Sequence, residues 1–182
     1  MNLTIITGRQ KKFEEAQKLI PSIKWEKIDL EEIQSMDYLK VAEHKLTEAS
    51  KLIQGNIIID DAGVELECLK GFPGTYAKDF INTIGFKQIP IITEKLGNNK
   101  AKITCTLGLR YNGENYFFQG IVEGRIMAPK LEEGFDYDLI FAPKDYERPF
   151  AELPFEIKMK ESHRTKAYEK LIEFLKQKDE QL

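Results

Sequence analysis

The chain has few cysteines and no surplus of positive charge. Its 182 residues include two cysteines, Cys68 and Cys105, which lie far apart and form no metal-binding spacing. Buried thiols in a reducing compartment are the ordinary interpretation of such a pair. The formal net charge is -3. Because proteins that coat DNA or RNA normally carry a strong positive excess, we expect no nucleic-acid partner.

Long apolar runs are also missing. No stretch approaches the roughly 20 apolar residues that a membrane helix needs, so we expect no membrane span. The N-terminal segment has no basic lead-in, and its apolar run is too short for a signal peptide. No internal repeat, linker or low-complexity segment interrupts the chain. We therefore expect a cytoplasmic protein with a single domain, residues 1–182, that is long enough to bury a core.

The first half of the chain alternates apolar strands with amphipathic helices. The hydrophobic pattern predicts strands at 3–7, 23–30 and 56–61, and helices at 10–20 and 37–54.

The second half has a different pattern. A turn cluster at 71–74 precedes helical segments that extend to about residue 96, and residues 101–109 alternate as in a half-buried strand. Asn112-Gly113 is a strong hairpin signal, followed by a partner strand at 116–127. A short strand at 139–141 and a final helix after Ser162 complete the chain. This order predicts an α/β fold with a mixed central sheet flanked by helices, in two lobes with a substrate cleft between them.

The junction between the first strand and the first helix is a candidate anion site. A helix N-terminus offers unpaired backbone N–H groups and the positive end of the helix dipole, so it attracts phosphate. Cations in the first turn are locally unfavourable unless an anion is bound nearby. A plain strand-to-helix turn with solvated lysines is the alternative, because the segment lacks a full P-loop pattern. The junction consists of Thr7, Gly8, Arg9, Gln10, Lys11 and Lys12.

Two adjacent carboxylates, Asp60 and Asp61, end the strand at 56–61. Successive side chains of a strand point to opposite faces, so only one of the two can enter a given site. Ligands of open α/β sheets gather beyond the carboxyl ends of the strands, where Asp61 lies. Mg²⁺ prefers one or two carboxylates plus substrate phosphates, and Glu31 or Glu32 is placed to supply the second carboxylate. The alternative is that these acids only cap loops.

Two later segments carry side chains suited to a flat ring. Phe135 and Tyr137 follow Gly134 and offer stacking faces, with acids beside them that accept a hydrogen bond from a ring N–H. The alternative is a hydrophobic loop anchor. His163 and Arg164, at the start of the last helix, are able to donate to a carbonyl oxygen. Alternatively, His163 closes the edge of the core and Arg164 is solvated.

These segments follow one another in the order of a known family. The chain resembles the inosine/xanthosine triphosphate pyrophosphatases, enzymes that remove noncanonical purine nucleotides. The similarity runs from Thr4 to about Leu175. The matching segments are Thr7-Gly8-x-x-x-Lys12, Asp61-x-Gly63-x-Glu65, Gly71-x-Pro73-Gly74-x-Tyr76, Gly134-Phe135-x-Tyr137-Asp138-x-x-Phe141, and Phe150-Ala151-Glu152 through Lys158 to Ser162-His163-Arg164.

The resemblance implies a role for each segment. Residues 7–12 would wrap the triphosphate, with Lys12 on its charge, and Lys45, on the polar edge of the second helix, would lie near the phosphates. Glu32 and Asp61 would hold Mg²⁺, and Asp61 would also activate or orient the attacking water. The implied catalytic residues are therefore Asp61, Lys12 and Lys45. The implied base-binding residues are Phe135, Asp136, Tyr137 and Asp138 beside the ring, and Lys158, His163 and Arg164 at its edge.

The implied reaction is hydrolysis of ITP, dITP or XTP to the monophosphate and pyrophosphate, by a protein that forms a homodimer. Two positions depart from the family's pattern. Arg9 stands where the family usually has Asn, which adds a charge to the loop. Ala62 stands at a substrate-contacting position where the family usually has Ser or Thr, which deletes a donor.

Two other interpretations remain. A nucleotide pyrophosphatase of the Maf type would have a different base preference, and the Ser-His-Arg segment together with the Phe-x-Tyr-Asp loop counts against it. A nucleotide-binding regulator without turnover would have no need of paired metal carboxylates, so the presence of both Glu32 and Asp61 counts against that interpretation.

Overall fold

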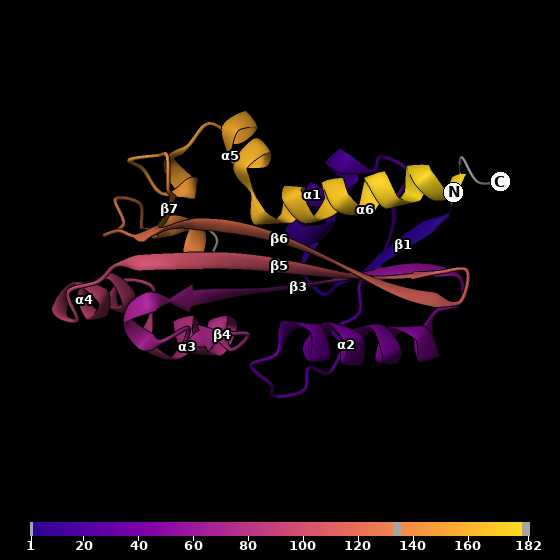
Figure 1. Ribbon diagram of the computed structural model, residues 1–182, viewed down its shortest axis with the longest axis horizontal. Coiled ribbons are helices and arrows are strands. Elements are labelled where there is room, and N and C mark those ends of the chain that lie inside the picture. The colour runs from indigo at the N-terminus through magenta and orange to yellow at the C-terminus, as the bar shows by residue number, and fades with distance from the viewer. Residues whose placement is uncertain (1, 133–135, 180–182) are drawn as a thin grey trace. The chain divides into compact units, whose positions relative to one another are not determined.

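The computed structural model describes residues 2–132 and 136–179, without the side chains of Asp136 and Asp179. It contains a seven-stranded sheet with the order β2-β1-β3-β5-β6-β7, in which β4 pairs with β3 (Figure 1). β1 is parallel to β2 and β3, whereas β4 and β7 are antiparallel to their partners, so the predicted mixed sheet is confirmed. The strands are β1 (Leu3–Ile6), β2 (Lys24–Glu26), β3 (Asn56–Leu66), β4 (Pro73–Gly74), β5 (Lys100–Tyr111), β6 (Glu114–Ile126) and β7 (Phe141–Pro143).

Helices flank this sheet, as predicted. They are α1 (Gln10–Leu19), α2 (Tyr38–Leu52), α3 (Ala77–Ile84), α4 (Gln88–Lys95), α5 (Phe155–Glu161) and α6 (His163–Asp179). Short 3-10 turns occupy Glu67–Leu69, Asp136–Leu139 and Phe150–Glu152. Among the helices that residues 2–132 and 136–179 form, none has the length and apolar character needed to cross a membrane.

Contacts within the chain divide it into two compact units. Unit 1 comprises Met1–Asp61, Cys105–Gly120 and Arg164–Leu182, and unit 2 comprises Ala62–Thr104 and Ile121–His163. Strands β3, β5 and β6 therefore contribute residues to both units. The single domain and the cleft between two lobes stay predictions.

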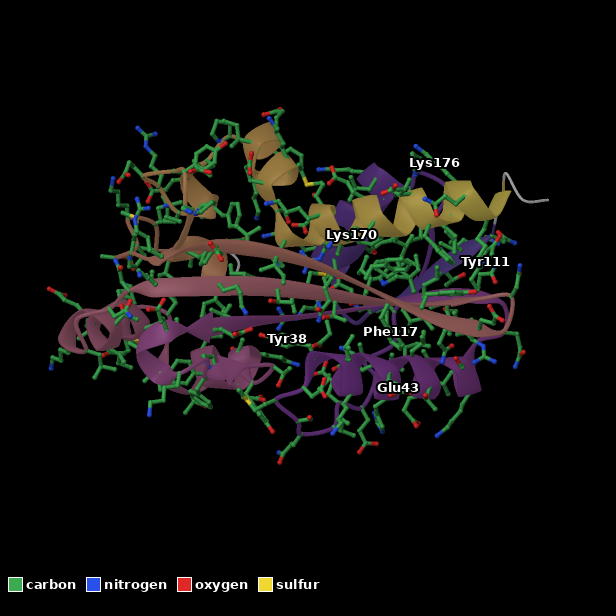
Figure 2. The ribbon with its side chains drawn as sticks, in the orientation of Figure 1. Tyr38, Glu43, Tyr111, Phe117, Lys170 and Lys176 are labelled. Carbon is green, nitrogen blue, oxygen red and sulfur yellow. The ribbon has the colours of Figure 1, made fainter. Side chains whose placement is uncertain are left out.

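Unit 1 buries apolar side chains on both faces of its strands. Ile57 and Ile59 of β3 pack with Leu46 of α2, and Phe117 of β6 joins them on that face (Figure 2). Ile58 points the other way and packs against side chains of α1 and α6. Figure 1 accordingly shows α2 on one face of the unit 1 strands and α1 with α6 on the other. Because side chains alternate along a strand, this pattern sets the direction of the polar residues that follow Ile59.

Local signals explain where several elements begin and end. The carboxylate of Asp37 accepts hydrogen bonds from Leu39 N at 2.9 Å and Lys40 N at 3.3 Å, so it caps α2 at its expected start. Asn112 and Gly113 have φ angles of 51° and 89°, which is the backbone that a two-residue hairpin turn requires. The predicted hairpin between β5 and β6 is therefore confirmed.

Short elements depart from the predicted boundaries. β4 and α5 were not expected, because a two-residue strand and a seven-residue helix carry too little periodicity to be recognised. β7 begins at Phe141 rather than at residue 139, because a 3-10 turn occupies Asp136–Leu139. β3 continues to Leu66, beyond the expected end at Asp61, because Val64 and Leu66 enter the core of unit 2.

Gly124 in unit 2 has no room for a side chain. It pairs with Pro143 of β7, and a Cβ atom at this position would lie 2.2 Å from Ala142 O and 2.6 Å from Phe141 Cζ. We expect Gly124→Ala to lower the free energy of unfolding by about 2 kcal/mol, as overpacking typically does. Urea unfolding of the two proteins would measure this difference. Glu123→Ala, an exposed neighbour on the same strand, should change the value far less, and equal effects would contradict the steric explanation.

Candidate active site

Asp61 faces α2, where its carboxylate meets Lys45. The Lys45 ammonium donates to Asp61 Oδ1 at 3.1 Å and to Glu32 Oε1 at 2.7 Å. Lys45 is buried, with 7% of its surface exposed, so its expected place on the polar edge of the helix is wrong. Burial alone would lower the pKa of Lys45, but the charges of Asp61 and Glu32 outweigh burial and raise the pKa above its ordinary value. Lys45 therefore carries its charge at neutral pH.

The second oxygen of Asp61 has no partner. Asp61 Oδ2 is buried and makes no hydrogen bond within residues 2–132 and 136–179. Two carboxylates and one ammonium leave the Asp61–Lys45–Glu32 cluster with one net negative charge. Such an oxygen normally requires a donor or a cation. The cluster is therefore suited to a positive ligand.

Asp60 faces the opposite side of β3 and meets two cations. Its carboxylate is fully buried, with Oδ1 2.9 Å from Lys12 Nζ and Oδ2 2.6 Å from Arg164 Nε. Lys12 Nζ also donates to the backbone carbonyl of Asp60 at 2.8 Å. Burial by itself would raise the pKa of Asp60, but the charges of Arg164 and Lys12 hold the pKa well below its ordinary value. Asp60 is therefore a fixed negative charge.

Arg164 lies deep in unit 1 rather than in solvent. Its side chain is 6% exposed, and Nη1 forms an ion pair with Glu15 Oε2 in addition to the bond from Nε to Asp60. The two carboxylates raise the pKa of Arg164 well above its ordinary value, against the effect of burial, which would lower it. Of the two alternatives for Arg164, a solvated side chain is wrong, and reading of a base edge by this residue stays a prediction.

A side chain of β2 contacts the backbone of the Thr7-to-Lys12 loop. Trp25 Nε1 donates to Thr7 O at 2.8 Å, and the Trp25 ring stacks on Phe13 with 4.9 Å between ring centroids. Arg9 N donates to Thr7 Oγ1 at 3.2 Å. Gly8 packs against Asp29, where a Cβ atom would come within 3.3 Å of Oδ1. The loop therefore has a defined backbone.

The start of α1 has the polarity expected for an anion site. No acidic residue lies in its first turn, and the side chain of Arg9 does not cap it. The exposed Gln10 side chain donates to Glu14 Oε1 at 2.8 Å, on the same helix, and Lys11 is half-buried. The positive end of the α1 dipole is thus not offset by a nearby carboxylate in that turn.

Apart from Arg164, the residues predicted to bind a base belong to unit 2. Asp138 forms an ion pair with Lys158, and both side chains are largely buried. Tyr137 is buried and its hydroxyl donates to Ala77 O at 3.1 Å, so this residue anchors its turn in the core.

Four further predicted site residues remain, and two of them lie wholly or partly outside the described residues. Phe135 lies outside the described residues, and so does the side chain of Asp136. His163 begins α6 with 8% of its surface exposed, and Ala62 is half-buried on β3. Their roles toward a base or phosphate stay predictions.

Lys12, Asp60, Arg164 and Glu15 contact one another in unit 1, and sequence reasoning missed the parts played by Glu15 and Asp60. Glu15 lies one helical turn after Lys12 and beside the buried Ala16, which was the available signal that its carboxylate points inward. Asp60 was recognised only as the neighbour of Asp61. Its identification as a partner of Lys12 required the fold, because those residues are 48 positions apart in sequence.

Comparison with known proteins decides the family. The Ham1 family model matches residues 3–174. The chain belongs to the Ham1 family. The predicted resemblance is thereby confirmed across the length of the matched motifs.

Curated members of the Ham1 family are similar over almost the whole chain. A protein of Methanopyrus kandleri named dITP/XTP pyrophosphatase is 36% identical over 182 residues, covering 97% of each chain. A Thermococcus kodakarensis protein of the same name is 34% identical, covering 97% of this chain and 98% of its own. The inosine triphosphate pyrophosphatase of Yarrowia lipolytica is 33% identical, covering 100% of this chain and 99% of its own.

Solved Ham1 structures share the fold. The Staphylococcus aureus Ham1 protein superposes with a TM-score of 0.79 at 28% identity, covering 96% of this chain and 99% of its own. A HAM1 protein from Coxiella burnetii gives a TM-score of 0.82 at 23% identity, covering 97% of this chain and 100% of its own. At this identity the comparison concerns the fold alone.

Proposed function

We propose that this Ham1 family member is a pyrophosphatase that hydrolyses noncanonical purine nucleoside triphosphates, such as dITP, ITP and XTP, to the monophosphate and pyrophosphate. The names of its curated relatives support the reaction and the substrate class. The observation that carries the proposal is the buried Asp61 carboxylate. One of its oxygens accepts from Lys45, and the other has no partner among the described residues.

The Asp61–Lys45–Glu32 cluster fits Mg²⁺. The described residues contain no group of three or more acidic, histidine or cysteine side chains able to enclose a metal ion. Mg²⁺ does not need such a group, because it usually binds one or two carboxylates and completes its shell with water and substrate phosphates. Glu32 and Asp61 are therefore the proposed ligands. When bound, the ion would supply positive charge against the triphosphate.

The protein's own residues then have distinct roles. The 7–12 loop binds the triphosphate through backbone N–H groups at the start of α1, and Lys12 and Lys45 place positive charge beside it. Asp61 orients a water molecule by accepting one of its hydrogens. Attack of the water oxygen on the α-phosphorus forms a new P–O bond. The bond from the α-phosphorus to the oxygen that bridges it to the β-phosphate breaks, and that oxygen leaves with the electron pair as part of pyrophosphate. The proton lost by the attacking water passes to bulk solvent.

Base selection belongs to unit 2 and the start of α6 in this proposal. Asp138 and Lys158 already form a buried ion pair, so together they can present both an acceptor and a donor to a ring edge. Phe135, Asp136, Tyr137, His163 and Arg164 complete the proposed set. Homodimerisation is also part of the proposal, on the family resemblance alone. A cytoplasmic location is proposed as well, from the two widely separated cysteines.

Pyrophosphate release from dITP, XTP, dATP and dGTP tests the proposal. We expect dITP and XTP to turn over at least about 10²-fold faster in kcat/KM than dATP, because a site built to hydrogen-bond a ring carbonyl strongly rejects adenine, which lacks it. Guanine keeps that carbonyl, so slower turnover of dGTP would reflect rejection of its 2-amino group. Omission of Mg²⁺ with chelator present should remove turnover of all four. Comparable rates on all four nucleotides would contradict base selection, and binding of dITP without any release would instead indicate a regulator.

A further inference from the structure

Asp60 takes no part in the proposed reaction, yet the fold encloses it completely. Its carboxylate is 0% exposed and contacts cations from both ends of the chain. A buried carboxylate of this kind is destabilising unless its partners satisfy it. The position of Asp60 next to Asp61 does not by itself account for its two cation partners.

The contacts around Asp60 form a closed ring. Lys12 Nζ donates to the backbone carbonyl of Asp60 at 2.8 Å and forms an ion pair with Oδ1 at 2.9 Å that lacks hydrogen-bond geometry. Asp60 Oδ2 binds Arg164 Nε at 2.6 Å, and Arg164 Nη1 binds Glu15. Glu15 and Lys12 lie one turn apart on α1, which closes the ring through the helix. Two carboxylates balance two cations, so no member of the ring is left with uncompensated charge.

This ring acts on Lys12, the member that the proposed function places beside the triphosphate. A lysine side chain has many rotamers, and a substrate that had to order Lys12 would bind less tightly. Two contacts to one residue remove that freedom before any phosphate arrives. The side chain of Lys12 is 13% exposed, whereas that of Asp60 is 0% exposed.

We propose that Asp60 is a positioning residue, which holds the Lys12 ammonium against the end of β3 while Arg164 and Glu15 hold the Asp60 carboxylate. The proposal rests on the proposed function, in which Lys12 binds the triphosphate. Asp60 touches neither substrate nor water in this role, and acts only through Lys12.

The test is a double-mutant cycle between Asp60→Asn and Lys12→Met. Asparagine keeps the size of the side chain but removes the charge that holds the ammonium. We expect Asp60→Asn to lower kcat/KM for dITP by about 10²-fold, the loss typical of a displaced catalytic group. In the Lys12→Met background, Asp60→Asn should lower kcat/KM by less than about a further threefold, because the ammonium that Asp60 holds is absent. Equal losses in both backgrounds would overturn the proposal.

Glu15→Gln gives a second test if Asp60→Asn does not fold. Glu15→Gln should lower kcat/KM for dITP less than Asp60→Asn does, because Glu15 acts on Lys12 through Arg164 and Asp60. This loss should also vanish in the Lys12→Met background. Glu14→Gln is the matched control, since Glu14 is the adjacent residue of α1 and is exposed. A loss for Glu15→Gln that persists without Lys12 would assign the ring a purely structural role.

Binding of inorganic pyrophosphate, measured by calorimetry with Mg²⁺ present, separates this proposal from the proposed function. Asp60→Asn should weaken that binding about tenfold when Lys12 is present and leave it unchanged when Lys12 is replaced. Failure of the wild-type protein to hydrolyse any nucleotide would overturn the proposed function, while this binding cycle would still decide the role of Asp60. Equal weakening in both backgrounds would reject positioning even in an active enzyme.

Discussion

Replacement of Asp61 by asparagine is expected to reduce pyrophosphate release at least about 10³-fold while the protein remains folded. The carboxamide oxygen can still accept from Lys45, so the contact that packs α2 against β3 persists. The substitution removes the charge of the second oxygen and places an N–H₂ group where a cation or a water hydrogen is proposed to bind. The Asp61–Lys45–Glu32 cluster also loses its net negative charge. Steady-state release from dITP with Mg²⁺ measures the effect.

Glu65→Gln is the matched control for Asp61→Asn. Glu65 lies on the same strand and also pairs with a lysine, Lys102, at 3.0 Å, but it belongs to unit 2 and to no proposed role. Its activity should stay within about threefold of wild type, as expected for a partly exposed ion pair. Near-normal turnover by Asp61→Asn itself, with an unchanged circular dichroism spectrum, would remove Asp61 from the mechanism.

Arg164→Ala should lower the free energy of unfolding by about 3 to 5 kcal/mol at pH 7, the usual result of leaving buried charge uncompensated. Asp60 and Glu15 both lose their guanidinium partner, and Lys12 alone remains beside Asp60. Alanine also leaves a space between α1 and α6 that neither carboxylate can fill. Urea unfolding followed by tryptophan fluorescence is a suitable measurement, because Trp25 packs on Phe13 of α1.

The destabilisation by Arg164→Ala should depend on pH. In the wild-type protein the pKa of Asp60 is lowered on folding, so its contribution to stability is fully present above its ordinary pKa and is lost only as the pH falls below that value. In the variant, burial opposes ionisation with Lys12 as the remaining cation, which raises the pKa of Asp60 relative to wild type. The difference in stability between the two proteins should therefore shrink as the pH is lowered from 7 to a value near the ordinary pKa of Asp60.

Lys176→Ala controls for the loss of a cation from α6. Lys176 is exposed on the same helix (Figure 2), and its removal should change stability by less than about 0.5 kcal/mol. A similarly small effect of Arg164→Ala at both pH values would mean that Asp60 and Glu15 are satisfied without Arg164, which contradicts the closed ring.

The directions of Asp60 and Asp61 were predictable from sequence, whereas their partners were not. The alternation of side chains along a strand was enough to place the two carboxylates on opposite faces. Which cation meets each of them depends on the packing of α1, α2 and α6 on those faces. Arg164 is 104 residues from Asp60 in sequence, and no local pattern reports such a contact.

Lys45 shows why charged residues beside an apolar stripe are difficult to place. The helical spacing identified Ala42, Leu46 and Ala49 as the buried face of α2, and all three lie in the core. Lys45 adjoins this stripe and was assigned to its polar edge. It is buried because Asp61 and Glu32 approach from other elements and compensate its charge. Periodicity reports apolar burial, but it carries no information about ion pairs between elements.

The ring around Asp60 also has a consequence for the order in which the protein can be assembled. During synthesis Lys12, Glu15 and Asp60 leave the ribosome early, but Arg164 follows Glu15 by 149 residues. Until that segment emerges, the nascent chain contains both carboxylates without the guanidinium that binds them, so α1 and β3 cannot reach their final packing at low energy. The docking of α6 is therefore the step that completes unit 1, and a ribosome that stalls before Arg164 holds a chain in which Glu15 and Asp60 still lack their guanidinium partner.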